Sequence, residues 1–129
     1  PEKRMLSSMS PTILEKNQQL FLVVGSPGGS TIITSVFQTI MNVIIFNMDI
    51  QSAVNAPRFH HQWLPDNIFL EENSFSKEIT DSLINIGHQV KERSSMGHVN
   101  AILINNNQIK TGADKRGENL GIELYIPAN

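Results

Sequence analysis

A strand-like run, a glycine-rich loop and a helix-like run follow one another without a break in residues 20–46, and this order restricts the possible folds more than any other feature. Residues 20–24 are uniformly apolar, which predicts a strand covered on both faces. Residues 25–30 are rich in Gly, Ser and Pro, which permit unusual backbone angles. In residues 32–44 apolar side chains recur at helical spacing, which predicts a long, largely buried helix capped by Ser30.

The segment before this unit predicts a β-hairpin. Residues 12–14 form a second short apolar run, and a polar connection of about five residues joins it to residues 20–24. Beyond the long helix, Asp49 can cap a short helix over residues 50–56, and Ser76 and Gly87 can cap a helix between them. Further strands are expected at residues 67–71, 89–92, 99–104, 108–111 and 122–126. The chain is therefore predicted to be one α+β domain over residues 1–129.

Residues 58–66 connect the short helix to the next strand. We expect an ordered connection there, because Phe59, Trp63 and Leu64 are large apolar residues that favour burial.

Composition narrows the possible functions. A formal net charge of −2 gives no basic surface for nucleic acid. The longest apolar stretch is interrupted by polar residues and is shorter than the roughly 20 residues of a membrane span. There is no cysteine, so disulfides, zinc–thiolate sites and thiol catalysis are excluded. Because the chain starts at Pro1 without a Met or signal pattern, we expect it to be a piece of a longer protein.

The glycine-rich loop predicts an anion or oxyanion site. Free backbone N–H groups converge where a loop enters a helix, and the helix dipole favours negative charge there. A P-loop would need a Lys after Gly29, where Ser30 and Thr31 stand, and a dinucleotide loop would need a different glycine spacing. A tight turn without a ligand remains the alternative.

Ser7 and Ser8 precede the predicted hairpin. An antiparallel pairing places the start of its first strand near the end of its second, which brings both serines toward Gly28 and Gly29. Hydroxyls and backbone N–H groups together suit a carboxylate and a developing oxyanion. Taken singly, a serine in such a position is more often a plain solvent-exposed or capping residue.

Three motifs, at residues 6–13, 25–34 and 55–65, resemble the small subunit of bacterial γ-glutamyltranspeptidase, also called glutathione hydrolase. The resemblance implies an N-terminal-nucleophile hydrolase with a four-layered αββα sandwich, formed when a precursor cleaves itself into a large and a small subunit. It implies that an N-terminal Thr attacks the γ-glutamyl amide and that the γ-glutamyl group then passes to water or an acceptor amine. Ser7 and Ser8 would bind the substrate α-carboxylate, and the N–H groups of Gly28 and Gly29 would form the oxyanion hole.

The chain departs from the family pattern at its start, since only six residues precede Ser7. The nucleophile motif, the acidic residue for the substrate α-amine and the large subunit are not in this sequence. We therefore expect the 129-residue chain alone to be inactive and the large subunit of the same precursor to be its partner. The resemblance implies no cofactor and a periplasmic or extracellular location.

Four other groups of residues favour structural roles. His60 and His61 would point to opposite sides of an extended segment, and His88 and His98 lie far away, so we expect structural hydrogen bonds and no metal. Arg58 and Arg116 are expected to tie loop carbonyls or a carboxylate together. Glu71 and Glu72 are neighbours on a predicted strand and favour a solvated edge over an acid/base pair. The helix after Ser76 should pack its apolar face on a sheet.

Two other functions stay open. One is an acylase of the same superfamily acting on another amide, such as a cephalosporin side chain or a poly-γ-glutamate chain. The other is a non-catalytic binding or assembly module. We also expect the strands at residues 20–24 and 99–104 to lack neighbours in this chain, and the exposed edges to favour self-association.

Overall fold

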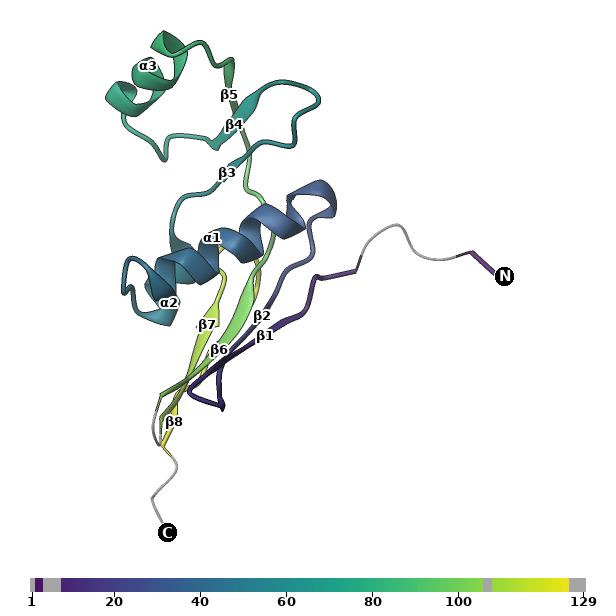
Figure 1. Ribbon diagram of the computed structural model, residues 1–129, viewed down its shortest axis with the longest axis vertical. Coiled ribbons are helices and arrows are strands. Elements are labelled where there is room, and N and C mark those ends of the chain that lie inside the picture. The colour runs from purple at the N-terminus through teal and green to yellow at the C-terminus, as the bar shows by residue number, and fades with distance from the viewer. Residues whose placement is uncertain (1, 4–7, 106–107, 126–129) are drawn as a thin grey trace.

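The computed structural model describes residues 2–3, 8–105 and 108–125. Two sheets and three α-helices make up the described chain, and the smaller sheet lies with α3 at one end of the molecule (Figure 1). The larger sheet has the order β1-β2-β6-β7-β8, with all neighbours antiparallel. Its strands are Thr12–Lys16, Gln19–Gly25, Asn100–Asn105, Gln108–Ala113 and Leu124–Tyr125. The chain is thus α+β, as predicted.

The predicted hairpin is confirmed, with a shorter turn. β1 and β2 pair from Thr12 opposite Val24 to Lys16 opposite Gln19, so only Asn17 and Gln18 connect them. Both turn residues have positive φ, at 54° and 61°, which matches the twist of a two-residue hairpin turn. The polar residues 15, 16 and 19 therefore belong to the strands rather than to the connection.

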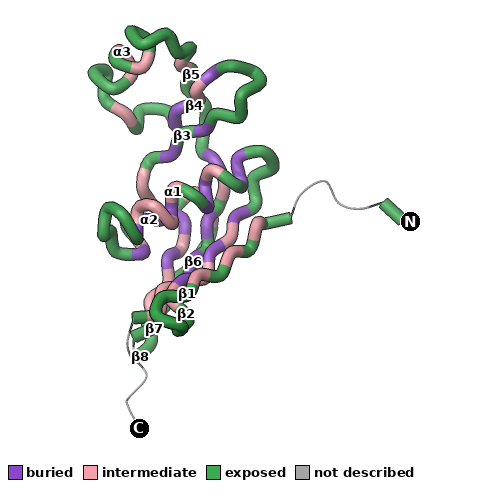
Figure 2. The backbone as a smooth tube through the Cα atoms, viewed as in Figure 1, coloured by how far each residue is buried: buried purple, intermediate pink, exposed green. Residues whose placement is uncertain are grey.

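Two helices cover one face of this sheet (Figure 1). After a 3₁₀ turn at Gly29–Thr31, α1 spans Ile32–Ile44, and α2 spans Ile50–Asn55. Ser30 does not cap α1: the N-cap is Thr31, which makes no side-chain capping hydrogen bond. Asp49 caps α2 as predicted, because its side chain accepts from the Ser52 N–H. The buried core lies between helices and sheet and comprises Leu22, Val24, Val36, Val43, Ile50, Ala53, Val54, Val99 and Ala101 (Figure 2).

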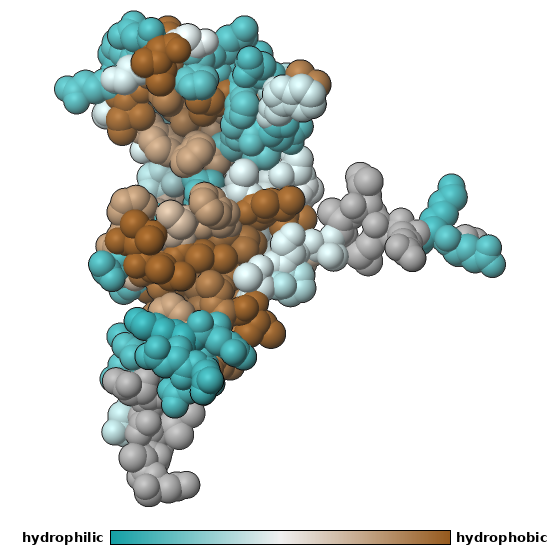
Figure 3. Space-filling view, viewed as in Figure 1, coloured by the Kyte–Doolittle hydropathy of each residue, from teal (hydrophilic) through white to brown (hydrophobic). Residues whose placement is uncertain are grey.

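The long helix is not largely buried in the described chain. Ser35 and Thr39 face the core, whereas Ile33 is 70% exposed and Phe37 is 56% exposed. Figure 3 shows apolar side chains gathered over the face that carries α1 and α2. The helical period predicted an apolar face correctly, but the helix is apolar on its outer side as well.

Strands β2 and β6 are interior strands, so the prediction that they lack neighbours is wrong. β2 pairs with β1 and β6, and β6 pairs with β2 and β7, which leaves β1 and β8 at the edges. The predicted cover on both faces of residues 20–24 is present on one face only. On the other face Val23 stands between Ile13 and Ile102 in register, and both isoleucines are exposed.

The smaller sheet has the order β3-β4-β5, with strands Phe59–His60, Ile68–Glu71 and Val90–Arg93. β4 and β5 are parallel, and α3, Lys77–Asn85, connects them. Ser76 caps α3 at its start and Gly87, with φ 102°, follows its end, as predicted. α3 contacts β5 of the smaller sheet as predicted, but no α3 residue is buried, and Ile79 and Ile84 are exposed.

The connection between β3 and β4 differs from the expectation in its burial. Phe59, Trp63 and Leu64 are exposed to 46%, 77% and 61%. The expectation that their size requires burial is therefore wrong for the described chain. No helix among the described residues is long and apolar enough to cross a membrane.

Candidate active site

The glycine-rich loop joins the end of β2 to the start of α1 in a conformation that requires glycine. Gly28 has φ 141° and Gly29 has φ 60°, both in the region that L side chains rarely adopt. The Thr31 N–H and hydroxyl both bond the Gly28 carbonyl, at 3.2 and 3.0 Å. This turns the carbonyl toward the helix and orients the peptide groups of the loop.

The loop is open to a ligand. Gly29 is exposed, and a Cβ built on it would meet no atom within 4 Å. The first turn of α1 contains no acidic residue, so no side-chain charge there opposes the positive end of the helix dipole. Among the described residues, the N–H groups of Gly28 and Gly29 donate to no protein acceptor. The arrangement can therefore stabilise a small anion or a developing oxyanion.

The segment before the hairpin lies beside this loop. The Ser26 N–H donates to the Met9 carbonyl at 2.9 Å, which continues the β1–β2 pairing into the loop. Ser8, the residue before Met9, is exposed. Ser7 lies outside the described residues, and within them no hydrogen bond joins Ser8 to either glycine. Met9 and Gly25 also line a hollow of about 350 Å³ on the uncovered face of the larger sheet.

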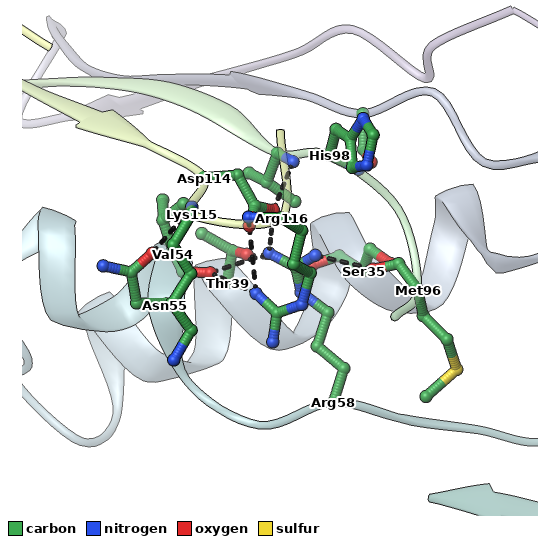
Figure 4. A network of polar contacts seen from close by, with 12 residues as sticks. Ser35, Thr39, Val54, Asn55, Arg58, Met96, His98, Asp114, Lys115 and Arg116 are labelled. Carbon is green, nitrogen blue, oxygen red and sulfur yellow. Dashed lines mark hydrogen bonds and ion pairs between the residues drawn. The ribbon is translucent and has the colours of Figure 1, made fainter. Parts of the chain in front are cut away.

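Four charged side chains, Arg58, Glu71, Asp114 and Arg116, form a buried network, of which Figure 4 shows Arg58, Asp114 and Arg116. Arg58 pairs with Asp114 at 2.7 Å, and Arg116 pairs with both Asp114 and Glu71. The two arginines and two carboxylates balance in charge, which buried ionised groups require. Their side chains are between 0% and 6% exposed.

The network also fixes backbone groups from several elements. Arg58 donates to the carbonyls of Val54 and Met96 at 2.7 and 2.6 Å. Arg116 donates to the carbonyls of Val54 and Ala56 at 3.2 and 2.9 Å. A planar guanidinium with several fixed donors suits such multiple contacts. The end of α2, the segment after β5 and the end of β7 are thereby joined.

Hydrogen bonds in the network keep its carboxylates ionised. Burial raises the pKa of the Glu71 carboxyl, but hydrogen bonds from Arg116 and from the Met96 and Arg58 N–H groups outweigh it and leave the pKa below its ordinary value. Burial likewise raises the pKa of Asp114, and N–H donors together with Arg58 lower it overall. Burial lowers the pKa of Arg58, whereas Glu71 and Asp114 raise the pKa of Arg116 despite its burial.

Glu71 corrects one prediction. It is 5% exposed and accepts from the Arg58 and Met96 N–H groups, both at 3.0 Å, so it does not lie on a solvated edge. Glu72, its neighbour on the other side of the chain, is exposed as expected. No functional or structural role was predicted for Asp114 from the sequence, although its side chain is fully buried. Its position directly after β7 and two residues before Arg116 was the available signal.

The histidines make hydrogen bonds. His60 is buried and bonds the Thr34 hydroxyl at 2.9 Å and the Gln62 side chain at 3.0 Å. His61 is exposed and bonds Asp66 at 3.1 Å. Among the described residues, no group of His, Asp and Glu side chains is arranged to hold a metal ion.

Comparison with known sequences identifies the family. A sequence model described as gamma-glutamyltranspeptidase matches residues 1–123. The chain belongs to the γ-glutamyltranspeptidase family. It is 47% identical to the glutathione hydrolase proenzyme of Escherichia coli (strain K12) over 104 residues, which cover 81% of this chain and 18% of that protein. It is 38% identical to the glutathione hydrolase proenzyme of Pseudomonas aeruginosa over 125 residues, covering 95% and 22%.

The fold agrees with this assignment. An alanine mutant of Helicobacter pylori gamma-glutamyltranspeptidase superposes with a TM-score of 0.85 at 49% identity, covering 90% of this chain and 64% of the solved one. The helix layer and the larger sheet are thus parts of an N-terminal-nucleophile hydrolase. The chain spans about a fifth of the length of the curated γ-glutamyltranspeptidases that it matches.

Proposed function

We propose that this chain supplies the oxyanion hole and part of the substrate pocket of an enzyme that cleaves γ-glutamyl amides such as glutathione. The observation that carries the proposal is the loop of Gly28 and Gly29, held at positive φ and open to solvent at the start of α1. In an acyl transfer reaction, a loop of this kind stabilises the negative charge that develops on the carbonyl oxygen.

The reaction proceeds through a covalent intermediate. The hydroxyl of the family's N-terminal Thr attacks the amide carbonyl, its α-amine takes the proton, and the carbonyl oxygen becomes an oxyanion. The N–H groups of Gly28 and Gly29 stabilise that oxyanion until the amine leaves with the proton. Water or an acceptor amine then attacks the γ-glutamyl ester and releases the Thr.

Four further residues bind the substrate or support the site in this proposal. Ser7 and Ser8 donate to the α-carboxylate of the γ-glutamyl group. Arg58 and Arg116 have a structural role, which their contacts with carbonyls and carboxylates support. The Thr and the acidic residue for the α-amine come from parts of the enzyme outside these 129 residues, including a large subunit of the same precursor. By the same family reasoning the intact enzyme is periplasmic or extracellular.

The test uses the intact gene product that carries this chain. It should release p-nitroaniline from γ-glutamyl-p-nitroanilide, and Ser7→Ala or Ser8→Ala should raise KM by about 10- to 100-fold, the effect of losing a hydrogen bond to a charged group. Ser82→Ala on α3, whose side chain is exposed, should leave KM unchanged.

Two further measurements separate the alternatives. A substrate panel in which cephalosporin or poly-γ-glutamate amides react and simple γ-glutamyl amides do not would assign the acylase function instead. The isolated 129-residue chain should give no turnover above background, because the nucleophile is not among its residues. Turnover by that chain would contradict the proposed division of the active site.

A further inference from the structure

The segment of residues 96–99 lies between the charged network and the glycine-rich loop. Three of its backbone polar groups are bound by that network. The Met96 N–H donates to Glu71 at 3.0 Å, and the Met96 carbonyl accepts from Arg58 at 2.6 Å. The Val99 N–H donates to Asp114 at 2.8 Å. The segment is therefore held from both ends by buried side chains, and its position follows that of the network.

The opposite side of this segment contacts the loop. A Cβ added to Gly28 would lie 3.0 Å from the Cα of Gly97. A Cβ added to Gly97, which has φ 68°, would lie 2.7 Å from the Ser26 hydroxyl and 2.8 Å from the Ser35 hydroxyl. Such distances are shorter than van der Waals contact allows, so only glycine fits between the loop and α1. The backbones at 28 and 97 are in direct contact.

Ser26 joins the two segments by hydrogen bonds. Its side chain is fully buried, accepts from the His98 N–H at 3.1 Å and donates to the Pro27 carbonyl at 2.7 Å. One hydroxyl thus ties the segment behind the loop to the peptide that leads into Gly28. Ser26 is fully buried, so its side chain does not touch a ligand bound at the exposed Gly29.

We propose that Ser26 and Gly97 are positioning residues that fix the N–H groups of Gly28 and Gly29 for the oxyanion. This inference rests on the proposed function. An oxyanion hole acts only if its donors are held within about 0.5 Å of the productive geometry before the reaction. The buried network holds the backbone of residues 96–99 in place. Gly97 and Ser26 connect this backbone to the loop, and so fix the position of its N–H groups.

The variants are Ser26→Ala and Gly97→Ala in the intact gene product, with γ-glutamyl-p-nitroanilide as substrate. The oxyanion exists in the transition state and not in the ground state, so kcat should fall by about tenfold or more while KM stays within about twofold. Affinity for a γ-glutamyl boronic acid analogue, which forms a tetrahedral adduct, should fall by the same factor as kcat. A loss of folded protein alone lowers the active fraction and does not change that affinity.

Matched controls separate positioning from general strain. Gly87→Ala introduces the same kind of strain at φ 102°, but its Cβ would meet no atom within 4 Å, so kcat per folded enzyme should be unchanged. Ser82→Ala controls for loss of a hydroxyl. If Gly97→Ala fails to fold, Ser26→Ala alone decides.

The outcomes also separate this inference from the proposed function. Wild-type enzyme that cleaves γ-glutamyl amides, with Ser26→Ala as active as Ser82→Ala, would overturn the positioning role and leave the proposed function intact. A change in KM without a change in kcat or boronate affinity would overturn it as well. A wild-type protein without γ-glutamyl cleavage would overturn the proposed function first.

Discussion

Glu71 brings together groups that are remote in the sequence. Its carboxylate accepts from the Arg58 N–H, the Met96 N–H and the Arg116 guanidinium. These donors occupy most of the lone-pair positions of the two carboxylate oxygens. The hydrogen bonds compensate for removal of the carboxylate from water. Residues 58, 96 and 116 lie at the ends of different elements, so a single side chain sets the relation between them.

Replacing Glu71 by Gln should destabilise the intact protein by about 3 kcal/mol, the cost of leaving a buried ion without its partner. The amide presents N–H donors to Arg116 and to the Met96 N–H, which are donors themselves. Glu72→Gln, one residue away and exposed, should change the free energy of unfolding by less than about 0.5 kcal/mol. Urea unfolding of both variants is the measurement. Equal stabilities would show that the network contributes nothing to the folded state.

The same variant carries a pH signature. The pKa values of Glu71 and Asp114 are lower in the folded than in the unfolded chain, so their contribution is complete above the ordinary carboxyl pKa of about 4 and is lost as the pH falls through the folded values. The free energy of unfolding of Glu71→Gln should therefore fall less than that of the wild type as the pH is lowered from about 5.

Local signals predicted individual residues only where a short stretch of chain defines their role. Asp49, Ser76 and Gly87 were identified as helix caps, since a cap depends on its own few neighbours. The burial of Glu71 and Asp114 was not predicted, because it depends on partners up to 56 residues away in the sequence. The position of Gly28 and Gly29 between a strand and a helix was enough to predict an anion site. The contact of Gly28 with Gly97 could not be predicted, because the two residues are far apart in the sequence.

At the scale of elements, helix α2 lies directly against strand β7. Gly112 lies on β7 opposite Ala101 of β6, beneath α2. A Cβ there would stand 2.7 Å from a methyl carbon of Val54 and 2.9 Å from the Ile50 carbonyl oxygen. The helix backbone can approach the sheet this closely only because position 112 has no side chain.

Gly112→Ala should therefore force α2 away from β7 and destabilise the protein by about 1–3 kcal/mol, as overpacking does. The matched variant is Gly25→Ala on β2, where the nearest atom would be the Met9 carbonyl oxygen at an acceptable 3.4 Å. The difference in Tm between the two variants, followed by circular dichroism, is the measurement. A Tm for Gly112→Ala at or above that of Gly25→Ala would mean that α2 shifts at no cost.

The types of the elements could be predicted from hydrophobic periodicity, whereas the burial of their apolar faces could not. The hairpin, α1, α2 and α3 were all predicted near their observed bounds, since apolar spacing and caps are local. The exposure of Phe37, Trp63 and Ile86 was not, because a sequence pattern does not say whether the surface that covers an apolar face belongs to the same stretch of chain.

At the scale of the whole molecule, the apolar outer face of α1 departs from an ordinary monomer surface. Ile33, Phe37 and Ile44 follow one another along the helix at 70%, 56% and 43% exposure. Figure 3 shows a broad apolar area over the face that carries α1 and α2. Such areas on folded proteins mark contacts with other protein surfaces. The sheet edge is a weaker candidate for pairing, because the edge strand β1 carries Glu15 and Lys16.

The isolated 129-residue chain should consequently self-associate through the outer face of α1. Light scattering at increasing concentration should give a mass above that of one chain, and Ile33→Lys with Phe37→Lys should return it to one chain by placing charges in the contact. Ile86→Lys, directly after α3, changes a similarly exposed isoleucine, at 73%, in the part of the molecule that carries the smaller sheet, and should leave the mass unchanged. A single-chain mass for wild type at high concentration would contradict the prediction. A mass that falls with Ile86→Lys instead would move the contact to α3.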